Sequence, residues 1–301
     1  MEEAERIERL LDTTYRDRFW KKFVHGIHEY DMISRGDRIC VCISGGKDSM
    51  LMALLFKHLL RFTDIPFEVE YLVMNPGYRP YILEQIQVNL KRMDIPAKIV
   101  DGNIFRVVER IPAHPCSLCA KMRRGTLYRV ARDELGCNKI ALGHHYDDVI
   151  VTTLMNLLNS GSFQTMLPKL KAKNYKPMEL IRPLYFIREK DIIAFSKAID
   201  MHFIACACPL ADSAEELGLV SMRARTKELI AKLMKEYSPY VERSLFAAGG
   251  NVKMDAVLGY RKGGIKYSFL DNYRDIPATE KSPSLEEDRP CVEQATGIEP
   301  A

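Results

Sequence analysis

Hydrophobic residues follow two different rhythms along the chain. Short apolar runs that predict buried strands occur at Arg38–Ile43, Phe67–Met74, Ala97–Val100, Lys139–Leu142 and Met178–Arg182. Apolar residues at helical spacing predict helices between them, at Asp48–Phe62, Tyr81–Met93, Leu118–Leu135, Asp147–Leu158 and Lys190–Asp200. Strands and helices that alternate in this way are typical of an α/β fold with a doubly wound, mostly parallel sheet.

Further segments flank this central α/β domain, which we expect to span residues 34–220. Residues 1–33 predict a helical N-terminal extension. Residues 221–274 read as helical at first and then irregular, and the lysine-rich segment Lys169–Pro177 reads as a loop. Residues 275–301 are rich in proline, serine and acidic residues, so we expect a disordered acidic tail.

The composition is that of a globular protein. Of the 301 residues, 47% are hydrophobic and 28% are charged, and no apolar run approaches the roughly 20 residues of a membrane helix. The acidic start Met1–Glu5 has no apolar core after it, which argues against a signal peptide. We therefore expect a cytoplasmic protein without a membrane partner.

The net charge of +4 conceals an asymmetry. Residues 275–301 hold seven acidic and two basic residues, so the rest of the chain holds 42 basic and 33 acidic ones. This excess favours a polyanionic partner, although solvated surface charge explains each residue taken alone. The clustered bases are Arg16, Arg18, Lys21, Lys22, Lys121, Arg123, Arg124, Arg129, Arg132, Lys169, Lys171, Lys173 and Lys176.

A glycine-rich segment directly follows the first predicted strand. Its sequence is Ser44-Gly45-Gly46-Lys47-Asp48-Ser49, and a predicted helix comes next. Glycines let the backbone approach an anion closely, and the helix N-terminus presents N–H groups and a partial positive charge. Lys47 can neutralise phosphate oxygens, Asp48 can hold Mg²⁺, and the two serines can donate hydrogen bonds. The segment therefore predicts a phosphate-binding loop.

This loop is not a Walker A loop, which needs glycine where the chain has Val41 and Ser or Thr where it has Asp48. It resembles the PP-loop of the N-type ATP pyrophosphatases, which cleave ATP between the α and β phosphates to adenylylate a substrate. A later segment, Gly143-His144-His145-Tyr146-Asp147-Asp148, resembles the Gly-His-x-x-Asp-Asp segment of the same superfamily. Without that resemblance, its histidines would be interpreted as helix-capping or packing residues.

The resemblance implies a site for ATP and Mg²⁺. The expected nucleotide-binding residues are Ser44, Gly45, Gly46, Lys47, Asp48, Ser49, Met74, Gly143, His144, Asp147 and Arg182. Lys47 and Asp48 are the expected catalytic residues, and Asp48 is the expected magnesium ligand. Lys47, with Arg182 as a second candidate, would stabilise phosphate charge.

Eight cysteines in a chain without a secretory signal favour metal ligands or redox groups over disulfides. Cys116 and Cys119 form a Cys-x-x-Cys pair at a helix start, where two thiolates can reach one metal centre. Two ligands do not complete a site, and Cys206 and Cys208 are the candidate partners. The other four are expected to be structural: Cys40 and Cys42, buried on one face of the first strand, and Cys137 and Cys291.

Three metal sites compete for these cysteines. Structural zinc would take all four thiolates of the two pairs. A deaminase zinc site is excluded, because none of the seven histidines has a glutamate two residues later. A 4Fe–4S cluster held by three cysteines would leave one iron open to bind sulfide. Zinc and iron–sulfur both remain open at this level.

The motifs together resemble the tRNA 2-thiocytidine synthetase family over roughly residues 15–245. The resemblance rests on the PP-loop, on residues 143–148 (the Gly-His-His segment), and on Cys-Ser-Leu-Cys followed by Arg123-Arg124-Gly125. The segments Ile181–Leu184 and Arg188–Asp191 also resemble that family. The resemblance implies a 4Fe–4S cluster on Cys116, Cys119 and a third cysteine. Cys206 matches best, but Cys208 stays an alternative, because the family has Cys-x-x-Cys where this chain has Cys-x-Cys.

The resemblance implies ATP-dependent thiolation of tRNA at C2 of an anticodon-loop cytidine, with Cys116, Cys119 and Cys206 as catalytic cysteines. Its implied partners are the tRNA anticodon loop, a sulfur donor such as a cysteine desulfurase, and a second copy of the chain in a homodimer. Two alternatives remain. One is a PP-loop thiolase or ligase of the 2-thiouridine or lysidine type with structural zinc. The other is a non-catalytic RNA-binding module.

Overall fold

The computed structural model describes residues 2–108, 115–204 and 221–273. Its contacts divide the chain into two compact units, the first ending at Gly250 and the second beginning at Asn251. The strands of the first unit are β1 (Arg38–Ile43), β2 (Glu68–Asn75), β3 (Ala97–Asp101), β4 (Lys139–Ala141), β5 (Lys169–Lys171) and β6 (Glu179–Ile181). The helices that connect or follow these strands are α3 (Lys47–Phe62), α4 (Pro80–Arg92), α5 (Ile104–Val108), α6 (Pro115–Arg129), α7 (Tyr146–Ser160), α8 (Glu189–Ala198), α10 (Met222–Glu236) and α11 (Val241–Ala248).

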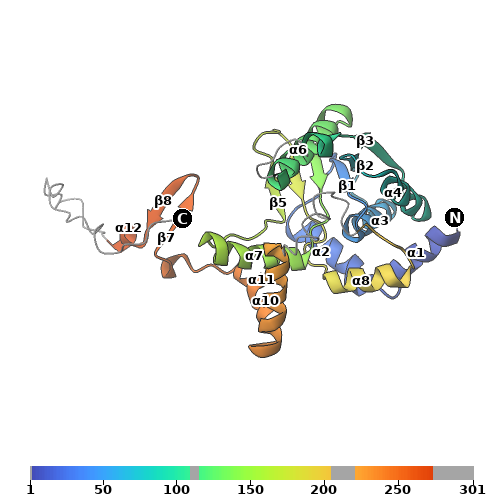
Figure 1. The fold of residues 1–301 in the computed structure, drawn as a ribbon. Helices are drawn as coiled ribbons and strands as arrows, with labels where there is room; N and C mark the ends of the chain where they lie inside the picture. The colour runs from blue at the N-terminus through green and yellow to red at the C-terminus, as the bar shows by residue number, and fades with distance from the viewer. Residues whose placement is uncertain (1, 109–114, 205–220, 274–301) are drawn as a thin grey trace. The chain divides into compact units, whose positions relative to one another are not determined.

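The six strands form one sheet (Figure 1). Their order across the sheet is β3-β2-β1-β4-β6-β5. All neighbouring pairs are parallel except β5 and β6, which are antiparallel. The strand order runs outwards from β1 in both directions, so the crossover helices lie on both faces of the sheet. The predicted doubly wound, mostly parallel fold is confirmed.

Alternate residues of β1 serve the two faces of the sheet. Ile39 and Val41 belong to the large apolar cluster that α3, α4 and α8 help to form. Cys40 and Cys42 point to the other face, where they pack in a second cluster with Val130. The prediction that these two cysteines are buried on one face of the first strand is confirmed.

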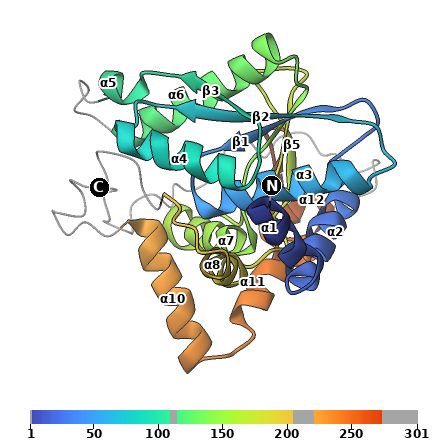
Figure 2. The same ribbon diagram turned by 90° about the vertical axis from the view of Figure 1, so that its right-hand side faces the viewer.

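The N-terminal segment forms α1 (Glu2–Asp12), a π-helical turn η1 (Arg16–Trp20) and α2 (Lys21–Glu29), as the helical pattern predicts. These elements lie beside α3 and α8 (Figure 2). The ring of Phe19 meets Phe195 of α8 edge-on at 5.4 Å, and Phe23 meets Phe56 of α3 in the same way at 5.4 Å. Such buried aromatic contacts make the N-terminal helices part of the main core.

The structure corrects one local prediction and extends another. The segment Lys169–Lys171, predicted as a loop, is strand β5 at the sheet edge, where Leu170 packs against the second cluster. Its lysines conceal the strand in the sequence, because an edge strand exposes one face to solvent. The helix predicted over Leu118–Leu135 begins earlier, at Pro115, and continues into a π-helical turn η2 (Val130–Glu134).

The second unit contains a hairpin that the sequence pattern does not predict. Strands β7 (Gly259–Lys262) and β8 (Ile265–Ser268) pair antiparallel, between a 3-10 turn η3 (Met254–Ala256) and helix α12 (Phe269–Tyr273). The predicted disordered tail, residues 275–301, lies outside the described residues. Within the described part of the chain, no helix combines the length and the apolar character needed to cross a membrane.

Candidate active site

The glycine loop joins the carboxyl end of β1 to the first turn of α3. Gly45 has φ +82°, and a Cβ atom there would lie 2.6 Å from Cγ1 of Ile86. A side chain at this position would therefore be strained and would also collide with α4. Gly46 precedes α3 as its N-cap in an extended conformation. The geometry of the loop thus requires glycine at position 45, whereas a Cβ atom at Gly46 would meet nothing closer than 3.4 Å.

The two serines of the loop brace it from within. The backbone N–H of Ser44 donates to Oγ of Ser49 at 3.1 Å, and the two hydroxyl oxygens also lie 3.1 Å apart. The Ser49 hydroxyl donates to the carbonyl of Gly46 at 3.0 Å. These bonds hold the turn that presents the N-terminus of α3, where backbone N–H groups can bind phosphate.

The Gly-His-His segment packs directly on this helix start. A Cβ atom at Gly143 would lie 3.0 Å from the backbone nitrogen of Ser49 and 3.1 Å from the carbonyl carbon of Asp48. Only glycine allows so close an approach of the loop after β4. The two motifs, about 100 residues apart in the sequence, therefore form one site.

His145 lies between acidic residues of both motifs. Its Nε2 is 3.7 Å from Oδ1 of Asp48 and 3.6 Å from Oδ2 of Asp148. Asp148 also accepts the backbone N–H of His145 at 3.2 Å, which caps the start of α7. The capping interpretation of the histidines is correct for His145.

The carboxylate of Asp48 is in an unusual environment. Burial raises its pKa above the ordinary range, against the opposing charges of His145 and Lys47. Its buried Oδ1 has no hydrogen-bond partner. A buried carboxylate oxygen without a donor is suited to a cation, because an unsatisfied charge is costly.

Lys47 reaches away from the loop toward α8. Its ammonium lies 3.2 Å from Asp48 and 3.0 Å from Oε1 of Glu189. Burial disfavours the ammonium, but Asp48 and Glu189 outweigh that effect and raise the pKa of Lys47. Glu189 also contacts Lys227 at 2.7 Å. Lys47 therefore carries its charge at neutral pH beside the phosphate-binding loop.

Asp147 takes a different role from its neighbour Asp148. Its carboxylate accepts from Arg188 at 3.1 Å and from the backbone N–H of Glu189 at 2.7 Å. These contacts tie α7 to the start of α8. Asp148 lines the site cavity and Asp147 does not.

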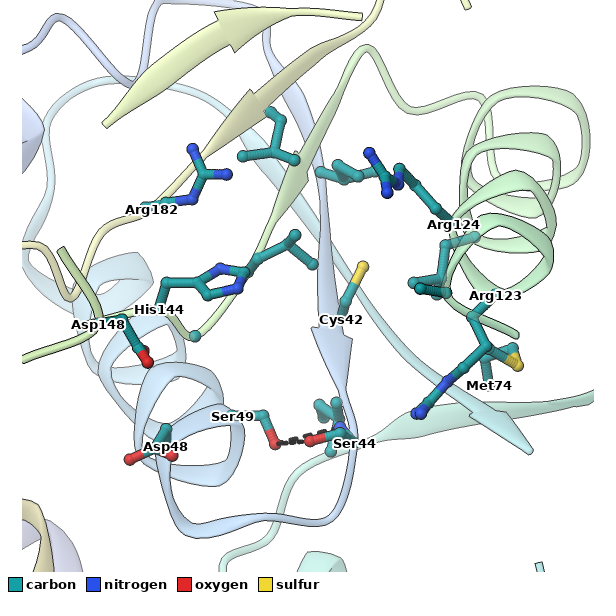
Figure 3. A pocket seen from close by; sticks show the side chains of 17 residues that line it. Cys42, Ser44, Asp48, Ser49, Met74, Arg123, Arg124, His144, Asp148 and Arg182 are labelled. Carbon is teal, nitrogen blue, oxygen red and sulfur yellow. Dashed lines mark hydrogen bonds between the residues drawn. The ribbon is translucent and has the colours of Figure 1, made fainter. Parts of the chain in front are cut away.

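A cavity of about 600 Å³ opens beyond the carboxyl ends of β1, β4 and β6 (Figure 3). Parallel sheets bind ligands at this edge. Asp48, Asp148 and His144 lie on one side of the cavity, and Arg123 and Arg124 approach from α6 on the other. Its lining includes Cys42, Ser44, Asp48, Ser49, Met74, Arg123, Arg124, Gly143, His144, Asp148 and Arg182.

His144 and Arg182 face this cavity as partly desolvated groups. Burial, together with the nearby charge of Arg182, lowers the pKa of His144 to about 4. Burial also lowers the pKa of Arg182, whose Nη1 donates to the carbonyl of Leu167. Nδ1 of His144 and Nε of Arg182 are buried without a hydrogen-bond partner. At neutral pH the site therefore offers a neutral imidazole beside a guanidinium.

The helix that carries the Cys-x-x-Cys pair is tied to the glycine loop. Nη2 of Arg123 donates to the hydroxyl of Tyr78 at 3.4 Å, and that hydroxyl donates to the carbonyl of Ser44 at 3.4 Å. Cys119 is buried near the start of α6, one residue before Ala120 of the cavity lining. Helix α6 therefore brings a thiol to the neighbourhood of the nucleotide loop.

The other predicted cysteine ligands lie partly or wholly outside the described residues. Cys116 is a residue of α6, but its side chain is not among those described. Cys206, Cys208 and Cys291 lie outside the described residues. Among the described side chains, no group of three or more His, Cys, Asp and Glu residues is arranged to hold a metal ion. Cys137 is buried in the second cluster, consistent with its expected structural role.

Most of the predicted nucleotide-binding residues lie around the same cavity. The structure adds residues that the sequence does not predict. Lys47 and Asp147 contact the site without lining the cavity. The sequence pattern assigns Glu189 no role beyond its place in a family-like segment. Of the predicted basic surface, Arg123 and Arg124 face the cavity, whereas Arg129 pairs with Glu134, Arg132 with Asp133 and Lys21 with Asp17.

The sheet order, the glycine loop and the adjoining cavity define a PP-loop nucleotide-binding protein, and the PP-loop domain model matches residues 15–208. The chain is 36% identical over 229 residues to the tRNA-cytidine(32) 2-sulfurtransferase of Citrifermentans bemidjiense, covering 75% of this chain and 87% of the relative. It is also 36% identical to the protein of that name from Coxiella burnetii, covering 85% and 96%. The chain belongs to the tRNA-cytidine(32) 2-sulfurtransferase family.

The fold also resembles a solved structure. This is the U34-tRNA thiolase NcsA from Methanococcus maripaludis with its 4Fe–4S cluster, which superposes with a TM-score of 0.58 at 22% identity. The match covers 77% of this chain and 78% of the other. At this identity the likeness concerns the fold.

Proposed function

We propose that this protein activates the C2 oxygen of a tRNA cytidine with ATP and replaces that oxygen with sulfur. The observation that carries the proposal is the shared cavity. The PP-loop forms one part of its wall, and α6, with Arg123, Arg124 and the nearby Cys119, forms another. Membership of the tRNA-cytidine(32) 2-sulfurtransferase family supports the same reaction.

In the proposed first step the base oxygen attacks the α-phosphate of ATP, and pyrophosphate leaves. The N-terminus of α3 and Lys47 would bind the phosphates, while Met74 and Gly143 would contact the adenosine. Arg182 would stabilise charge that develops at the α-phosphate. The product of this step is an adenylylated base whose C2 oxygen leaves as part of AMP in the second step.

The acidic residues beside the loop fit Mg²⁺. Asp48 has a buried oxygen without a hydrogen-bond donor, and Asp148 lines the same cavity. Carboxylate oxygens together with substrate phosphates are the usual ligands of this ion. Asp48, joined by Asp148, would hold Mg²⁺, and the ion would neutralise charge on the phosphates.

The cysteine set fits an iron–sulfur cluster in its chemistry. Cys116 and Cys119 are three residues apart on α6 and so lie on one face of the helix. Together with Cys206, or with Cys208 as the alternative, they would supply three thiolate ligands. When bound, the cluster would supply the sulfur atom that replaces the C2 oxygen. The sulfur would come from a donor such as a cysteine desulfurase.

The RNA substrate would enter as an unpaired nucleotide. Proteins read single-stranded loops by splaying out bases, and an anticodon loop offers such bases. Arg123 and Arg124 would hold its phosphate while the base reaches the cavity near His144. A neutral imidazole can hydrogen-bond a base edge without adding charge.

Mass spectrometry of tRNA nucleosides tests the proposal. We expect cells that lack this protein to lose 2-thiocytidine, and wild-type protein but not Lys47→Ala to restore it. Loss of 2-thiouridine or lysidine instead would show that the protein makes that nucleoside and not 2-thiocytidine. An unchanged nucleoside profile would contradict the proposal.

Anaerobic purification tests the metal independently. Brown protein with iron and sulfide supports thiolation, and colourless protein with stoichiometric zinc supports a ligase with a structural metal. Formation of AMP and pyrophosphate with tRNA would exclude a non-catalytic RNA-binding module.

A further inference from the structure

Helix α10 lies beyond the segment that matches the PP-loop domain, yet it packs against a PP-loop element. The match ends at residue 208, and α10 spans Met222–Glu236. Helix α10 lies against α7 (Figure 2). Its Ile230 is buried in a small apolar cluster with Ile150 and Val151 of α7. This packing fixes α10 beside the helix that begins at the Gly-His-His segment.

Two cations of α10 reach acidic residues of the nucleotide site. Nη1 of Arg223 lies 2.7 Å from Oδ1 of Asp148, and Nζ of Lys227 lies 2.7 Å from Oε2 of Glu189. Residues four positions apart share one face of a helix, so both side chains extend in the same direction. Because Asp148 lines the cavity, Arg223 stands next to the expected cation site.

Glu189 connects Lys227 with the glycine loop. Its other oxygen is 3.0 Å from the ammonium of Lys47, so one carboxylate holds two ammonium groups. Burial opposes the charged carboxylate, but hydrogen bonds from Lys227 and Lys47 outweigh it and lower the pKa of Glu189 to about 2. The two lysines are therefore held near each other at the start of α3.

The charge balance around the loop makes these two cations significant. Three carboxylates lie beside the glycine loop, those of Asp48, Asp148 and Glu189. The loop itself contributes one cation, Lys47. Before Mg²⁺ binds, these four groups carry a net negative charge, which would repel a polyphosphate. Arg223 and Lys227 add two positive charges and bring the group to neutrality. The cavity arginines approach instead from α6 and from the residue that follows β6.

We propose that α10 completes the phosphate-binding site, with Arg223 and Lys227 providing positive charge for the β- and γ-phosphates of ATP. The inference rests on the proposed use of ATP by the loop and does not depend on which tRNA base is thiolated. The cations act on the part of the nucleotide that leaves as pyrophosphate. Their loss therefore weakens binding of ATP far more than binding of AMP.

The test compares two nucleotides on the full-length protein purified anaerobically. Binding of α,β-methylene ATP and of AMP is measured by calorimetry in the presence of Mg²⁺. The variants are Arg223→Gln, Lys227→Gln and the double variant. The matched control is Lys232→Gln on the same helix, because Lys232 is exposed and pairs with Glu236 one turn away.

We expect each single variant to raise the Kd of the ATP analogue at least ~5-fold and the double variant at least ~20-fold. The Kd of AMP should change less than ~2-fold, and Lys232→Gln should leave both values unchanged. Equal losses for the two nucleotides would mean that α10 merely supports the fold of the site. Unchanged affinity for the ATP analogue would also overturn the inference.

Charge-preserving variants keep the test informative if the glutamine variants fold poorly. Arg223→Lys and Lys227→Arg should retain the preference for the ATP analogue over AMP. If these two variants lost that preference as fully as the glutamine variants do, the inference would be overturned.

The outcomes also separate the two proposals. A different thiolated nucleoside in the tRNA would refute the proposed substrate and leave the role of α10 intact. An ATP affinity that does not change in the α10 variants would refute the role of α10 and leave the proposed substrate intact.

Discussion

The ammonium of Lys47 lies 3.0 Å from the carboxylate of Glu189, a residue 142 positions further along the chain. This contact joins the glycine loop to α8, and through Lys227 it extends to α10. Contacts within the protein therefore hold the lysine beside the N-terminus of α3 without a bound phosphate. Preorganised charge of this kind is what phosphate chemistry requires.

The Glu189 contacts should make stability depend on pH. Hydrogen bonds from Lys227 and Lys47 lower the pKa of Glu189 from 4.5 to about 2, in spite of its burial. The folded protein therefore binds this proton less readily than the unfolded chain. The stabilisation is fully present above pH 4.5 and is lost as the pH falls toward 2. Its full size is at most about 3 kcal/mol, because solvent screens the partly exposed carboxylate.

Urea unfolding between pH 7 and pH 3 measures this effect. Glu189→Gln should be less stable than wild type at pH 7, and the difference should shrink as the pH falls. Glu228→Gln removes an exposed carboxylate of α10 and serves as the control, with little change expected. A destabilisation by Glu189→Gln that stays constant over this range would refute the ionic role of Glu189.

Gly143 should tolerate no side chain. Its missing Cβ would lie 3.0 Å from the backbone nitrogen of Ser49, and neither backbone segment can move without disturbing the glycine loop. Gly143→Ala should cost roughly 1–3 kcal/mol of stability and should weaken ATP binding. Calorimetry and urea unfolding measure both effects. Gly250→Ala is the control, because its Cβ would meet nothing closer than 4.0 Å, and equal behaviour of the two variants would contradict the close approach.

His144 should remain neutral throughout the physiological range. Burial and the nearby charge of Arg182 lower its pKa to about 4. An NMR titration of ring-labelled histidines, with His144→Gln to assign the signal, should give a midpoint near pH 4. A midpoint near 6.5 would mean that the imidazole is solvated and that the cavity carries an additional positive charge at mildly acidic pH.

Cys119 and Cys137 offer a comparison between two buried thiols. Both are buried, but Cys119 belongs to the Cys-x-x-Cys pair and Cys137 packs in the second apolar cluster. Cys119→Ser should lose most of its iron and reduce thiolation to background, whereas Cys137→Ser should keep both. Iron and sulfide analysis after anaerobic purification measures the difference. Retention of full iron by Cys119→Ser would remove this residue from the proposed ligand set.

The parts of the site that the sequence predicts are those encoded locally. The glycine loop, the strand before it and the helix after it are adjacent in sequence, so their types and spacing already specify a phosphate site. The position of Gly143 on the same site follows from the rule that parallel strands present their carboxyl ends at one edge. Family membership and the α/β fold were predictable for the same reason, and both are confirmed.

The parts that escaped prediction depend on contacts between distant segments. Arg223 and Lys227 look like ordinary surface charges of an amphipathic helix, and only the packing of α10 on α7 aims them at the site. Strand β5 escaped because its alternating lysines are polar and it pairs at the sheet edge. The different roles of Asp147 and Asp148 also depend on three-dimensional neighbours, since both lie in one short motif.

The most direct test of the central claim is an anaerobic reaction of the iron-loaded protein with unmodified tRNA, Mg²⁺, ATP and a sulfide source. Digested tRNA would be analysed by mass spectrometry, and AMP and pyrophosphate would be quantified in the same samples. The account predicts 2-thiocytidine in the tRNA, with one AMP and one pyrophosphate formed for each thiolated base, and no product with Lys47→Ala. Thiolation without ATP consumption, or AMP formation with no 2-thiocytidine, would contradict it.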